Sequence, residues 1–175
     1  MAVSNRMTTG FRRREVLAGL AAVLAGGAAA PAALAAGAGR LVKTAEQWRA
    51  LLPADRYAVL FEEDTERPGS SPLNREKRNG TYICAACFLP LFDSAKKYES
   101  GTGWPSFWAP LRGTLGTKTD YLIGLPRTEY HCIRCGGHQG HVFDDGPQPT
   151  GLRYCNNGLA LQFVPRGTPR PALRT

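Results

Sequence analysis

The sequence predicts an antiparallel β domain with short N-terminal helices, and three observations support this fold class. From Thr81 onward, short runs rich in β-branched and aromatic residues are separated by clusters of Gly, Pro, Asp and Asn. The chain contains 20 glycines and 13 prolines, a density of turn-forming residues typical of short strands joined by loops. Two Cys-x-x-Cys pairs end two of these runs and can hold one metal ion between them.

The first 35 residues are typical of an export signal. Arg13-Arg14 stand just before an uncharged, Ala-rich stretch over 16–39, a pattern that resembles the twin-arginine signal of proteins exported in the folded state. Ala33-Leu34-Ala35 fits the A-x-A pattern of a cleavage site. The alternative is an uncleaved membrane anchor, but Ala and Gly are weakly hydrophobic for a membrane-spanning helix. We therefore expect a cleaved signal over 1–35.

Length and composition predict one domain behind this signal. We expect a linker over 36–42, the domain over 43–165, and a basic, Pro-containing tail over 166–175. After cleavage the protein would be a periplasmic monomer with no attachment to the membrane.

The formal net charge of +8 does not by itself indicate a nucleic-acid partner. Four of the 22 basic residues and one of the 14 acidic residues lie in the first 35 positions, which leaves 18 basic against 13 acidic residues, or +5. Proteins that bind single strands of nucleic acid combine basic with stacking aromatic residues. The aromatic-rich stretch over 101–108 contains no Lys or Arg, so we expect no nucleic-acid partner.

Two short helices and a loop are predicted at the start of the domain. Thr44 followed by Gln47 is a capping-box pattern that predicts the start of the first helix. Pro53, a residue favoured in the first turn, predicts the start of the second. Residues 66–80 are rich in Pro, Gly and Ser and predict a polar surface loop. The apolar residues at helical spacing are Trp48, Leu51 and Leu52 in the first helix and Tyr57, Leu60 and Phe61 in the second.

Five short runs in the remaining sequence predict strands. Each is rich in β-branched or aromatic residues and is bounded by turn-forming residues. They cover residues 81–84, 119–125, 128–133, 141–143 and 159–164. Residues 151–163 also alternate, which places Cys155 in a strand-like run.

The two Cys-x-x-Cys pairs predict a structural metal centre. A turn with two residues between cysteines presents both sulfurs on one side, and two facing turns form a tetrahedral four-thiolate site typical of zinc. The site has no open position for a substrate, so the metal is expected to be structural. Two disulfides are the alternative in an oxidising compartment. The four cysteines are Cys84, Cys87, Cys132 and Cys135.

The fifth cysteine, Cys155, is a candidate nucleophile. A lone cysteine in a strand is more often a small buried apolar residue. Arg153, two residues away, would share its face of an extended strand and favour the thiolate by lowering the thiol pKa. Asn157, two residues after Cys155, would lie on the same face of the strand. These polar neighbours favour a reactive thiol.

Two histidines and an aromatic loop are further candidates for a site. His138 and His141 are suited to acid–base chemistry by the ordinary pKa of imidazole, although each can also be a surface side chain. Asp144 and Asp145 can orient an imidazole or cap a turn. Trp104 lies in a Gly/Pro/Ser loop and can form either part of the core or the apolar wall of a pocket.

These motifs together resemble the B-type peptide-methionine (R)-S-oxide reductases, methionine sulfoxide reductase B. The resemblance runs over residues 43–165 and includes both cysteine pairs. Three further motifs follow in the family's order. They are G-W-P-S-F, G-H-V-F-x-D-G-P and G-L-R-Y-C-x-N.

The resemblance implies two antiparallel β-sheets pinned by a structural zinc on the four paired cysteines. It implies thiol-dependent reduction of the R epimer of methionine sulfoxide, free or in oxidised proteins, as repair of oxidative damage. Cys155 would attack the sulfoxide sulfur and become a sulfenic acid, and His141 would polarise or protonate the sulfoxide oxygen. Trp104 would contact the substrate methyl group. The other residues that the resemblance assigns to the site are His138, Asp145, Arg153 and Asn157.

Thr102 is the departure from the family with the largest consequence. Many members carry there a second cysteine that resolves the sulfenic acid as a disulfide. Once the four paired cysteines hold zinc, Cys155 is the one thiol left over. We therefore expect an external thiol reductant, such as a thioredoxin-like protein, to regenerate Cys155.

Two other classes of protein share some of these features. A zinc-stabilised binding module without activity would account for the paired cysteines and the basic surplus. An inactive relative of the family would account for the fold, but not for Cys155, His138, His141 and Arg153 occurring together.

Overall fold

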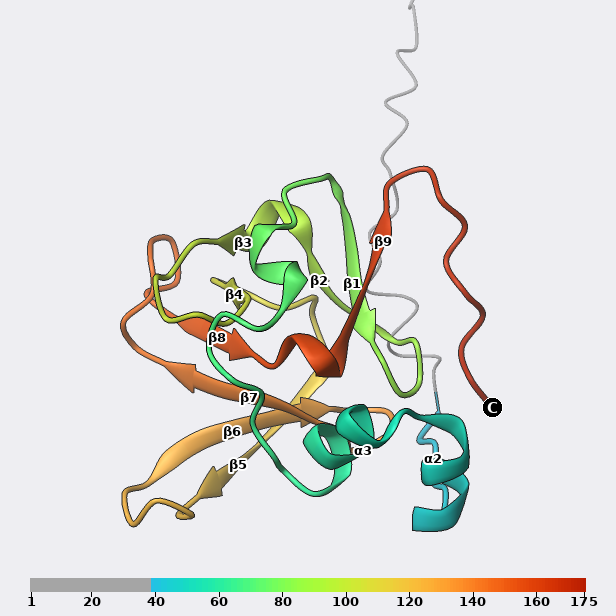
Figure 1. The fold of residues 1–175 in the computed structure, drawn as a ribbon. Helices are drawn as coiled ribbons and strands as arrows, with labels where there is room; N and C mark the ends of the chain where they lie inside the picture. The colour runs from blue at the N-terminus through green and yellow to red at the C-terminus, as the bar shows by residue number, and fades with distance from the viewer. Residues whose placement is uncertain (1–38) are drawn as a thin grey trace, which may run out of the picture.

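The fold is described by a computed structural model that covers residues 39–175 (Figure 1). The predicted signal over 1–35 lies outside the described residues, as does the start of the predicted linker. Among residues 39–175, no helix has the length and apolar character needed to cross a membrane.

Two short helices begin the described chain: α2, Ala45–Leu51, and α3, Ala54–Phe61. The predicted capping box is present, with the Thr44 hydroxyl accepting from the Gln47 backbone N–H and the Gln47 side chain accepting from the Thr44 N–H. Trp48 is buried and stacks on Phe61 with ring centroids 4.9 Å apart. Of the other two apolar residues at helical spacing, Leu52 is buried and Leu51 is exposed.

The segment from residue 62 to residue 79 includes most of the predicted polar surface loop over 66–80, and it is not a surface loop alone. It contains the 3-10 helix η1, Pro72–Arg75, and two of its polar side chains, Glu66 and Ser71, are buried. The Glu66 carboxylate accepts hydrogen bonds from the backbone N–H groups of Gly158 and Leu159. A buried carboxylate is tolerated when such donors surround it.

The strands form two antiparallel sheets, as expected. The smaller sheet has the order β2-β1-β9, with β1 at Gly80–Cys84, β2 at Pro90–Asp93 and β9 at Leu161–Pro165. The larger sheet has the order β3-β4-β8-β7-β6-β5. Its strands are β3 Lys97–Tyr98, β4 Ser106–Phe107, β5 Leu115–Asp120, β6 Arg127–Cys132, β7 His138–Phe143 and β8 Arg153–Asn156. Two further 3-10 helices, η2 at Ser94–Lys96 and η3 at Gly158–Ala160, follow β2 and β8.

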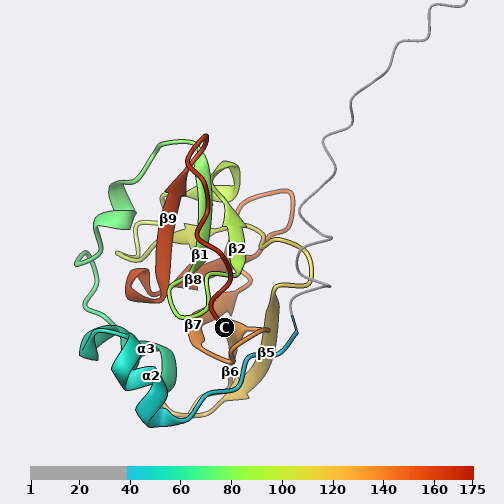
Figure 2. The ribbon, with the colours of Figure 1, turned by 90° about the vertical axis from the view of Figure 1, so that its right-hand side faces the viewer.

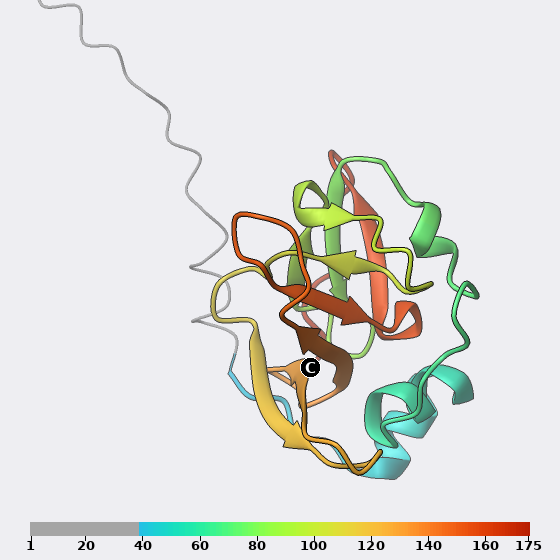
Figure 3. The same cartoon turned by 90° about the vertical axis from the view of Figure 1, so that its left-hand side faces the viewer.

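One predicted strand, over 119–125, has the wrong extent. Strand β5 ends at Asp120, and the next residues form the turn to β6. The Asp120 carboxylate accepts from the Leu122 N–H at 2.7 Å, and Gly124 adopts a positive φ of 79°. An aspartate that accepts from the backbone two residues later is a turn signal, and here it outweighs the β propensity of the residues that follow. Figure 3 shows the resulting hairpin extending beyond the rest of the large sheet.

Aromatic side chains from both sheets fill the core. Phe92 of the small sheet stacks on Phe107 of the large sheet, with ring centroids 4.2 Å apart. Tyr82 and Tyr130 extend this cluster from strands β1 and β6, and both are fully buried. Burying a large apolar side chain contributes about 1.5–3 kcal/mol, so this cluster fixes one sheet against the other.

Candidate active site and metal centre

Strand pairing places Cys155 in the middle of the large sheet. In β8, Cys155 pairs with His141 of β7 on one side and with Ser106 of β4 on the other. Gly140 permits this approach, because a Cβ atom at that position would lie 1.9 Å from the Cys155 carbonyl oxygen. The sheet therefore brings together two side chains that are 14 positions apart in the sequence.

A pocket of about 130 Å³ opens at this point. Four residues that the sequence analysis placed in the site line it, together with apolar and polar neighbours. The lining consists of Thr65, Trp104, Arg127, Gly140, His141, Phe143, Cys155, Asn156 and Asn157. A pocket with apolar walls and a few convergent polar groups is typical of a small-molecule site.

The Cys155 thiol is partly buried, and this burial opposes the effect of its cationic neighbour. Burial raises the pKa of Cys155, whereas the Arg153 guanidinium lowers it by charge and hydrogen bonding. Arg153 therefore acts on the pKa in the expected direction, but the desolvation of the thiolate outweighs it, and the net direction is a raised pKa.

Thr102 contacts the Cys155 sulfur. Its Oγ1 lies 4.0 Å from Cys155 Sγ, and it is held by Ser100, whose Oγ lies 2.8 Å away. Ser100 is linked in turn to the buried hydroxyl of Ser106 at 2.7 Å. A side chain at position 102 is thus within contact distance of the thiol that the sequence analysis singled out.

Arg153 and Asp145 form a bidentate ion pair beside the pocket. Arg153 Nε and one terminal nitrogen donate to the two Asp145 oxygens at 2.7 and 2.9 Å. The hydrogen bonds from Arg153 lower the pKa of Asp145. The guanidinium also lies 4.2 Å from the centroid of Phe143, one of the pocket walls. Because Asp145 binds the edge of the guanidinium group and Phe143 packs against its face, the Arg153 side chain is fixed next to Cys155.

His141 is paired with an aspartate that the sequence analysis missed. His141 Nε2 lies 2.7 Å from Asp120 Oδ2, and Arg127 donates to the same oxygen at 2.5 Å. Burial lowers the pKa of His141, and the Asp120 hydrogen bond opposes this. Asp120 and Arg127 face each other across the β5–β6 hairpin. An acidic and a basic residue closing a hairpin are the signal that could have identified them.

His138 lies behind His141 and does not line the pocket. Its ring is buried, 5.5 Å from the His141 ring centroid, with Nδ1 2.9 Å from Glu129 Oε1. Burial lowers the pKa of His138 to about 4. The ring is therefore neutral at neutral pH, with its proton on the nitrogen facing the carboxylate.

Glu66 connects Trp104 with Asn157. Its backbone carbonyl accepts from the Trp104 indole at 3.1 Å, and its N–H donates to Asn157 Oδ1 at 3.2 Å. No sequence pattern singles out Glu66, because its partners lie 38 and 91 positions away.

The four remaining cysteines form one cluster between the two sheets. Their sulfurs all lie within 4.8 Å of one another, with Cys84 and Cys135 3.7 Å apart and Cys87 and Cys132 3.5 Å apart. Tetrahedral zinc thiolates, with metal–sulfur distances of about 2.3 Å, place their sulfurs about 3.8 Å apart, whereas a disulfide needs about 2.05 Å. All four cysteines are free. The donor set therefore fits a tetrahedral metal ion and closes its coordination.

A family model and individual relatives of known name both match this chain. The SelR domain matches residues 52–165. The "Peptide methionine sulfoxide reductase MsrB" of Pseudomonas putida (strain W619) is 52% identical over 128 residues, which cover 73% of this chain and 96% of that protein.

The chain belongs to the MsrB family.

Two further MsrB relatives are similar to this chain over the same length. Proteins of that name from Pseudomonas savastanoi pv. phaseolicola and Bradyrhizobium diazoefficiens are 49% and 48% identical over 128 residues. In each case the match covers 73% of this chain, and it covers 98% and 92% of the two relatives. The pocket and the cysteine cluster both lie within the matched domain.

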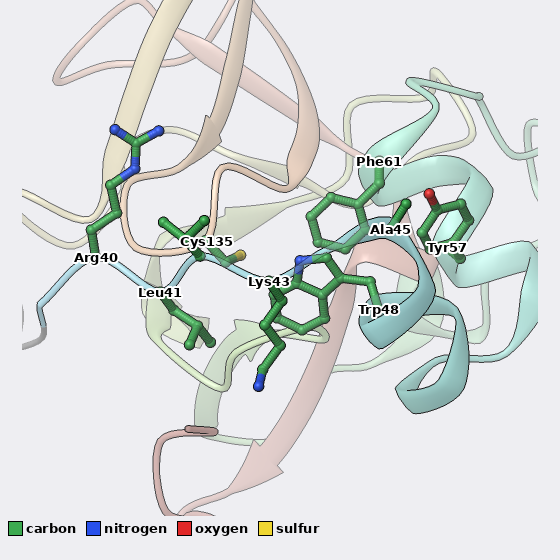
Figure 4. Close-up of a pocket in the computed structure, with 9 residues that line it drawn as sticks. Arg40, Leu41, Lys43, Ala45, Trp48, Tyr57, Phe61 and Cys135 are labelled. Atoms are coloured by element: carbon green, nitrogen blue, oxygen red, sulfur yellow. The ribbon is translucent and has the colours of Figure 1, made fainter.

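A second pocket of this MsrB-family chain, of about 280 Å³, lies beside the cysteine cluster. Figure 4 shows Leu41 and Cys135 on one side of it and Trp48, Phe61 and Tyr57 on the other. It shares no lining residue with the Cys155 pocket.

Proposed function

We propose that this protein reduces the R epimer of methionine sulfoxide, free or within oxidised proteins, to methionine. The observation that carries the proposal is the pocket in which Cys155 lies beside His141 and Trp104. Membership of the MsrB family supports the reduction of methionine sulfoxide. The resemblance to the B-type reductases supports selectivity for the R epimer. Oxidised proteins are then the partners, and repair of oxidative damage is the role.

Cys155 is the proposed nucleophile. Its thiolate attacks the sulfoxide sulfur, and the oxygen, once protonated, leaves that sulfur as water. Water then attacks the Cys155 sulfur, the bond between the two sulfurs breaks, methionine leaves, and Cys155 becomes a sulfenic acid. The sulfoxide sulfur is reduced by two electrons and the cysteine sulfur is oxidised by two. Arg153 favours this thiolate, whereas burial opposes it by raising the pKa of Cys155.

His141 is proposed to supply the proton or hydrogen bond to the sulfoxide oxygen. Asp120 occupies Nε2 of the ring, so Nδ1 is the nitrogen available to the substrate. The same aspartate favours the protonated ring and opposes the effect of burial on its pKa. Trp104 forms the wall for the methyl group, and Asp145, Arg153 and Asn157 organise the pocket, with His138 supporting His141 from behind.

An external thiol is proposed to regenerate Cys155. A first thiol attacks the sulfenic acid, releasing water and forming a mixed disulfide, and a second thiol then releases the Cys155 thiolate. Thr102, which contacts Cys155 Sγ, cannot form this disulfide from within the chain. A thioredoxin-like protein is the proposed reductant.

Zinc is the proposed occupant of the cysteine cluster, in a structural role. The cluster joins the end of β1 in the small sheet to the end of β6 in the large sheet. We expect Cys87→Ser to lose the metal and to unfold, as judged by metal analysis and circular dichroism. A folded, zinc-loaded and inactive Cys87→Ser protein would contradict the structural role.

The cellular setting is proposed from the sequence. The twin-arginine pattern supports export to the periplasm of a cleaved, monomeric domain over 43–165 with its basic tail, without nucleic-acid or membrane partners. Export in the folded state would allow metal loading before the thiols meet an oxidising compartment. Fractionation of cells expressing the full chain tests this, because an Arg13→Lys/Arg14→Lys variant should remain in the cytoplasm.

The decisive experiment is an activity assay with resolved R and S epimers of methionine sulfoxide. Wild type should reduce the R epimer, and Cys155→Ser should lose essentially all of that activity while keeping its fold and metal. Equal activity of the two proteins would refute the mechanism. Absence of activity in a metal-loaded wild type would favour the alternative, a zinc-stabilised binding module.

A further inference from the structure

The turn between β5 and β6 is the most exposed apolar feature of the described chain. Seven large hydrophobic side chains are exposed among residues 39–175, and four of them lie in this turn. Tyr121, Leu122, Ile123 and Leu125 are 66%, 80%, 60% and 67% exposed. We call residues 121–125 the hairpin tip. Clustered exposed apolar residues commonly mark an interaction site.

The hairpin tip is joined directly to the Cys155 pocket. It extends from Asp120 and Arg127, which pair with each other across the hairpin. Asp120 binds His141, and Arg127 lines the pocket. The hairpin is drawn at the lower left of Figure 1, beside β7. The first tip residue, Tyr121, therefore directly follows the aspartate that binds His141.

The hairpin tip also has a defined shape. The Leu122 N–H donates to Asp120 Oδ1 at 2.7 Å, and the Gly124 N–H donates to the Tyr121 carbonyl at 2.8 Å. The side chain that holds His141 thus also holds this turn. A preformed apolar surface loses little conformational entropy when it binds a partner.

We propose that the hairpin tip binds apolar side chains that flank methionine sulfoxide in an unfolded polypeptide. This rests on the proposed function, and it adds a surface that selects substrates. Methionine is mainly a core residue, and its oxidation disrupts the core around it. The chain exposed by such damage carries apolar neighbours on both sides of the oxidised residue.

The distances along the chain fit this occupant. A strand advances about 3.3 Å per residue, so side chains two to four positions from the sulfoxide lie about 7–13 Å from the pocket. The tip residues are one to five positions beyond Asp120. Free methionine sulfoxide has no flanking residues and therefore cannot reach the hairpin tip from the pocket.

The charge of the hairpin tip argues against other occupants. Residues 121–125 contain no ionisable group other than the Tyr121 phenol, and the flanking Asp120 and Arg127 neutralise each other. A surface that binds anionic lipid combines apolar with basic residues. An uncharged tip fits an uncharged, apolar peptide segment.

The test compares three substrates on the full-length, metal-loaded protein. They are N-acetyl-methionine R-sulfoxide, a peptide with the sulfoxide flanked by Leu and Val, and a peptide with it flanked by Gly and Ser. The variant is Leu122→Asn/Ile123→Asn, and the control is Val42→Asn, since Val42 is 76% exposed and remote from the pocket. Because the substituted side chains are exposed, the melting temperature should not change.

We expect wild type and Val42→Asn to prefer the Leu/Val peptide. The tip variant should lose about tenfold in kcat/KM on that peptide and less than twofold on the other two substrates. Equal losses on all three substrates, no preference in wild type, or a change only in the KM for the thiol reductant would overturn the proposal. Tip-dependent sedimentation with phosphatidylglycerol vesicles, with the peptide preference intact, would also overturn it. An inactive wild type on N-acetyl-methionine R-sulfoxide would instead refute the proposed function.

Discussion

The reactivity of Cys155 depends on the balance between burial and one guanidinium. Burial raises the pKa of the thiol, and Arg153 is the strongest of the groups that lower it. Arg153 is itself held by Asp145 and by the face of Phe143, so its charge has a fixed position. The pKa of the proposed nucleophile is therefore lowered by a residue that does not line the pocket.

Substituting Arg153 should move the titration of Cys155 to higher pH. Arg153→Met keeps much of the side-chain volume but removes the charge, which is expected to reduce the thiolate fraction at neutral pH roughly tenfold. Since the thiolate fraction rises with pH, the rate of iodoacetamide alkylation should reach its half-maximum at a higher pH. Arg166→Met, at an exposed position outside the pocket, serves as the control. An unchanged midpoint in Arg153→Met would contradict this account.

The contact between Thr102 and Cys155 predicts that one substitution can change the route of recycling. After one turnover without reductant, wild type should hold a sulfenic acid that reacts with dimedone. Thr102→Cys would place a sulfur near the Oγ1 position, 4.0 Å from Cys155 Sγ, and should form an intramolecular disulfide instead. Mass spectrometry distinguishes the two products. Ser100→Cys is the matched control and should retain the dimedone adduct, because the Ser100 hydroxyl contacts Thr102.

Among the elements, the segment over 62–79 has the largest influence on the site. Its buried Glu66 binds the backbone at the start of η3 and also holds Trp104 and Asn157 through its own backbone. Glu66 thus connects this polar segment, which has few apolar residues, to three other parts of the molecule. It forms part of the pocket wall through Thr65.

Glu66→Ala should therefore destabilise the domain. The Gly158 and Leu159 N–H groups would lose their acceptor, and unpaired buried donors with a charged partner removed cost about 2–4 kcal/mol in total. Urea unfolding of the metal-loaded protein measures this loss. Glu62→Ala, which removes an exposed pair with Arg49, should change the free energy of unfolding by less than about 1 kcal/mol. Similar losses in the two variants would show that the buried hydrogen bonds of Glu66 have no special weight.

The extent to which the sequence predicts the elements follows from their length and their contacts. The helices and all or part of strands β1, β6, β7, β8 and β9 were predicted because they show a period, a cap or a run of β-forming residues. Strands β4, Ser106–Phe107, and β2, Pro90–Asp93, are too short to show a clear period. The end of β5 depended on a side-chain contact of Asp120, which no local propensity describes.

The sequence predicts those site residues that belong to a recognisable motif. It does not predict residues whose place in the site depends on a contact formed only in the folded protein. The pocket contains Cys155, His141, Trp104 and Asn157, all of which the sequence indicated. Asp120 and Glu66 were missed because an isolated carboxylate has no pattern, and their partners are 21 and 92 positions away. Long-range pairs of this kind become visible only after the sheets are assembled.

At the scale of the whole molecule, both ends of the described chain meet at the cysteine cluster. Near the start, the Leu41 N–H donates to the Arg134 carbonyl in the turn between Cys132 and Cys135. At the end, the tail over 166–175 folds back along the small sheet, as Figure 2 shows, and the Arg174 N–H donates to the Cys87 carbonyl at 3.1 Å. The predicted linker and tail thus cover the two turns that supply the metal ligands.

Removing the tail should weaken the metal centre without changing the catalytic pocket. A chain that ends at Pro165 loses the Arg174 contacts to Cys87 and to the Leu51 carbonyl, together with the apolar packing of Leu173. Each lost hydrogen bond or partly buried side chain contributes about 1 kcal/mol. We therefore expect zinc release to a chelator to be about tenfold faster and the melting temperature to fall by several degrees.

The same measurement on single substitutions separates the Arg174 contacts from tail length. Arg174→Ala should reproduce part of the faster zinc release, whereas Arg170→Ala, at an exposed position of the same tail, should release zinc at the wild-type rate. Turnover of N-acetyl-methionine R-sulfoxide by freshly loaded protein should be equal in all three proteins, because the tail does not line the Cys155 pocket. Zinc release that is unaffected by the truncation would mean that the cysteine turns keep their geometry without the tail. A loss of turnover in fully loaded protein would instead indicate that the two ends of the molecule are coupled through the sheets.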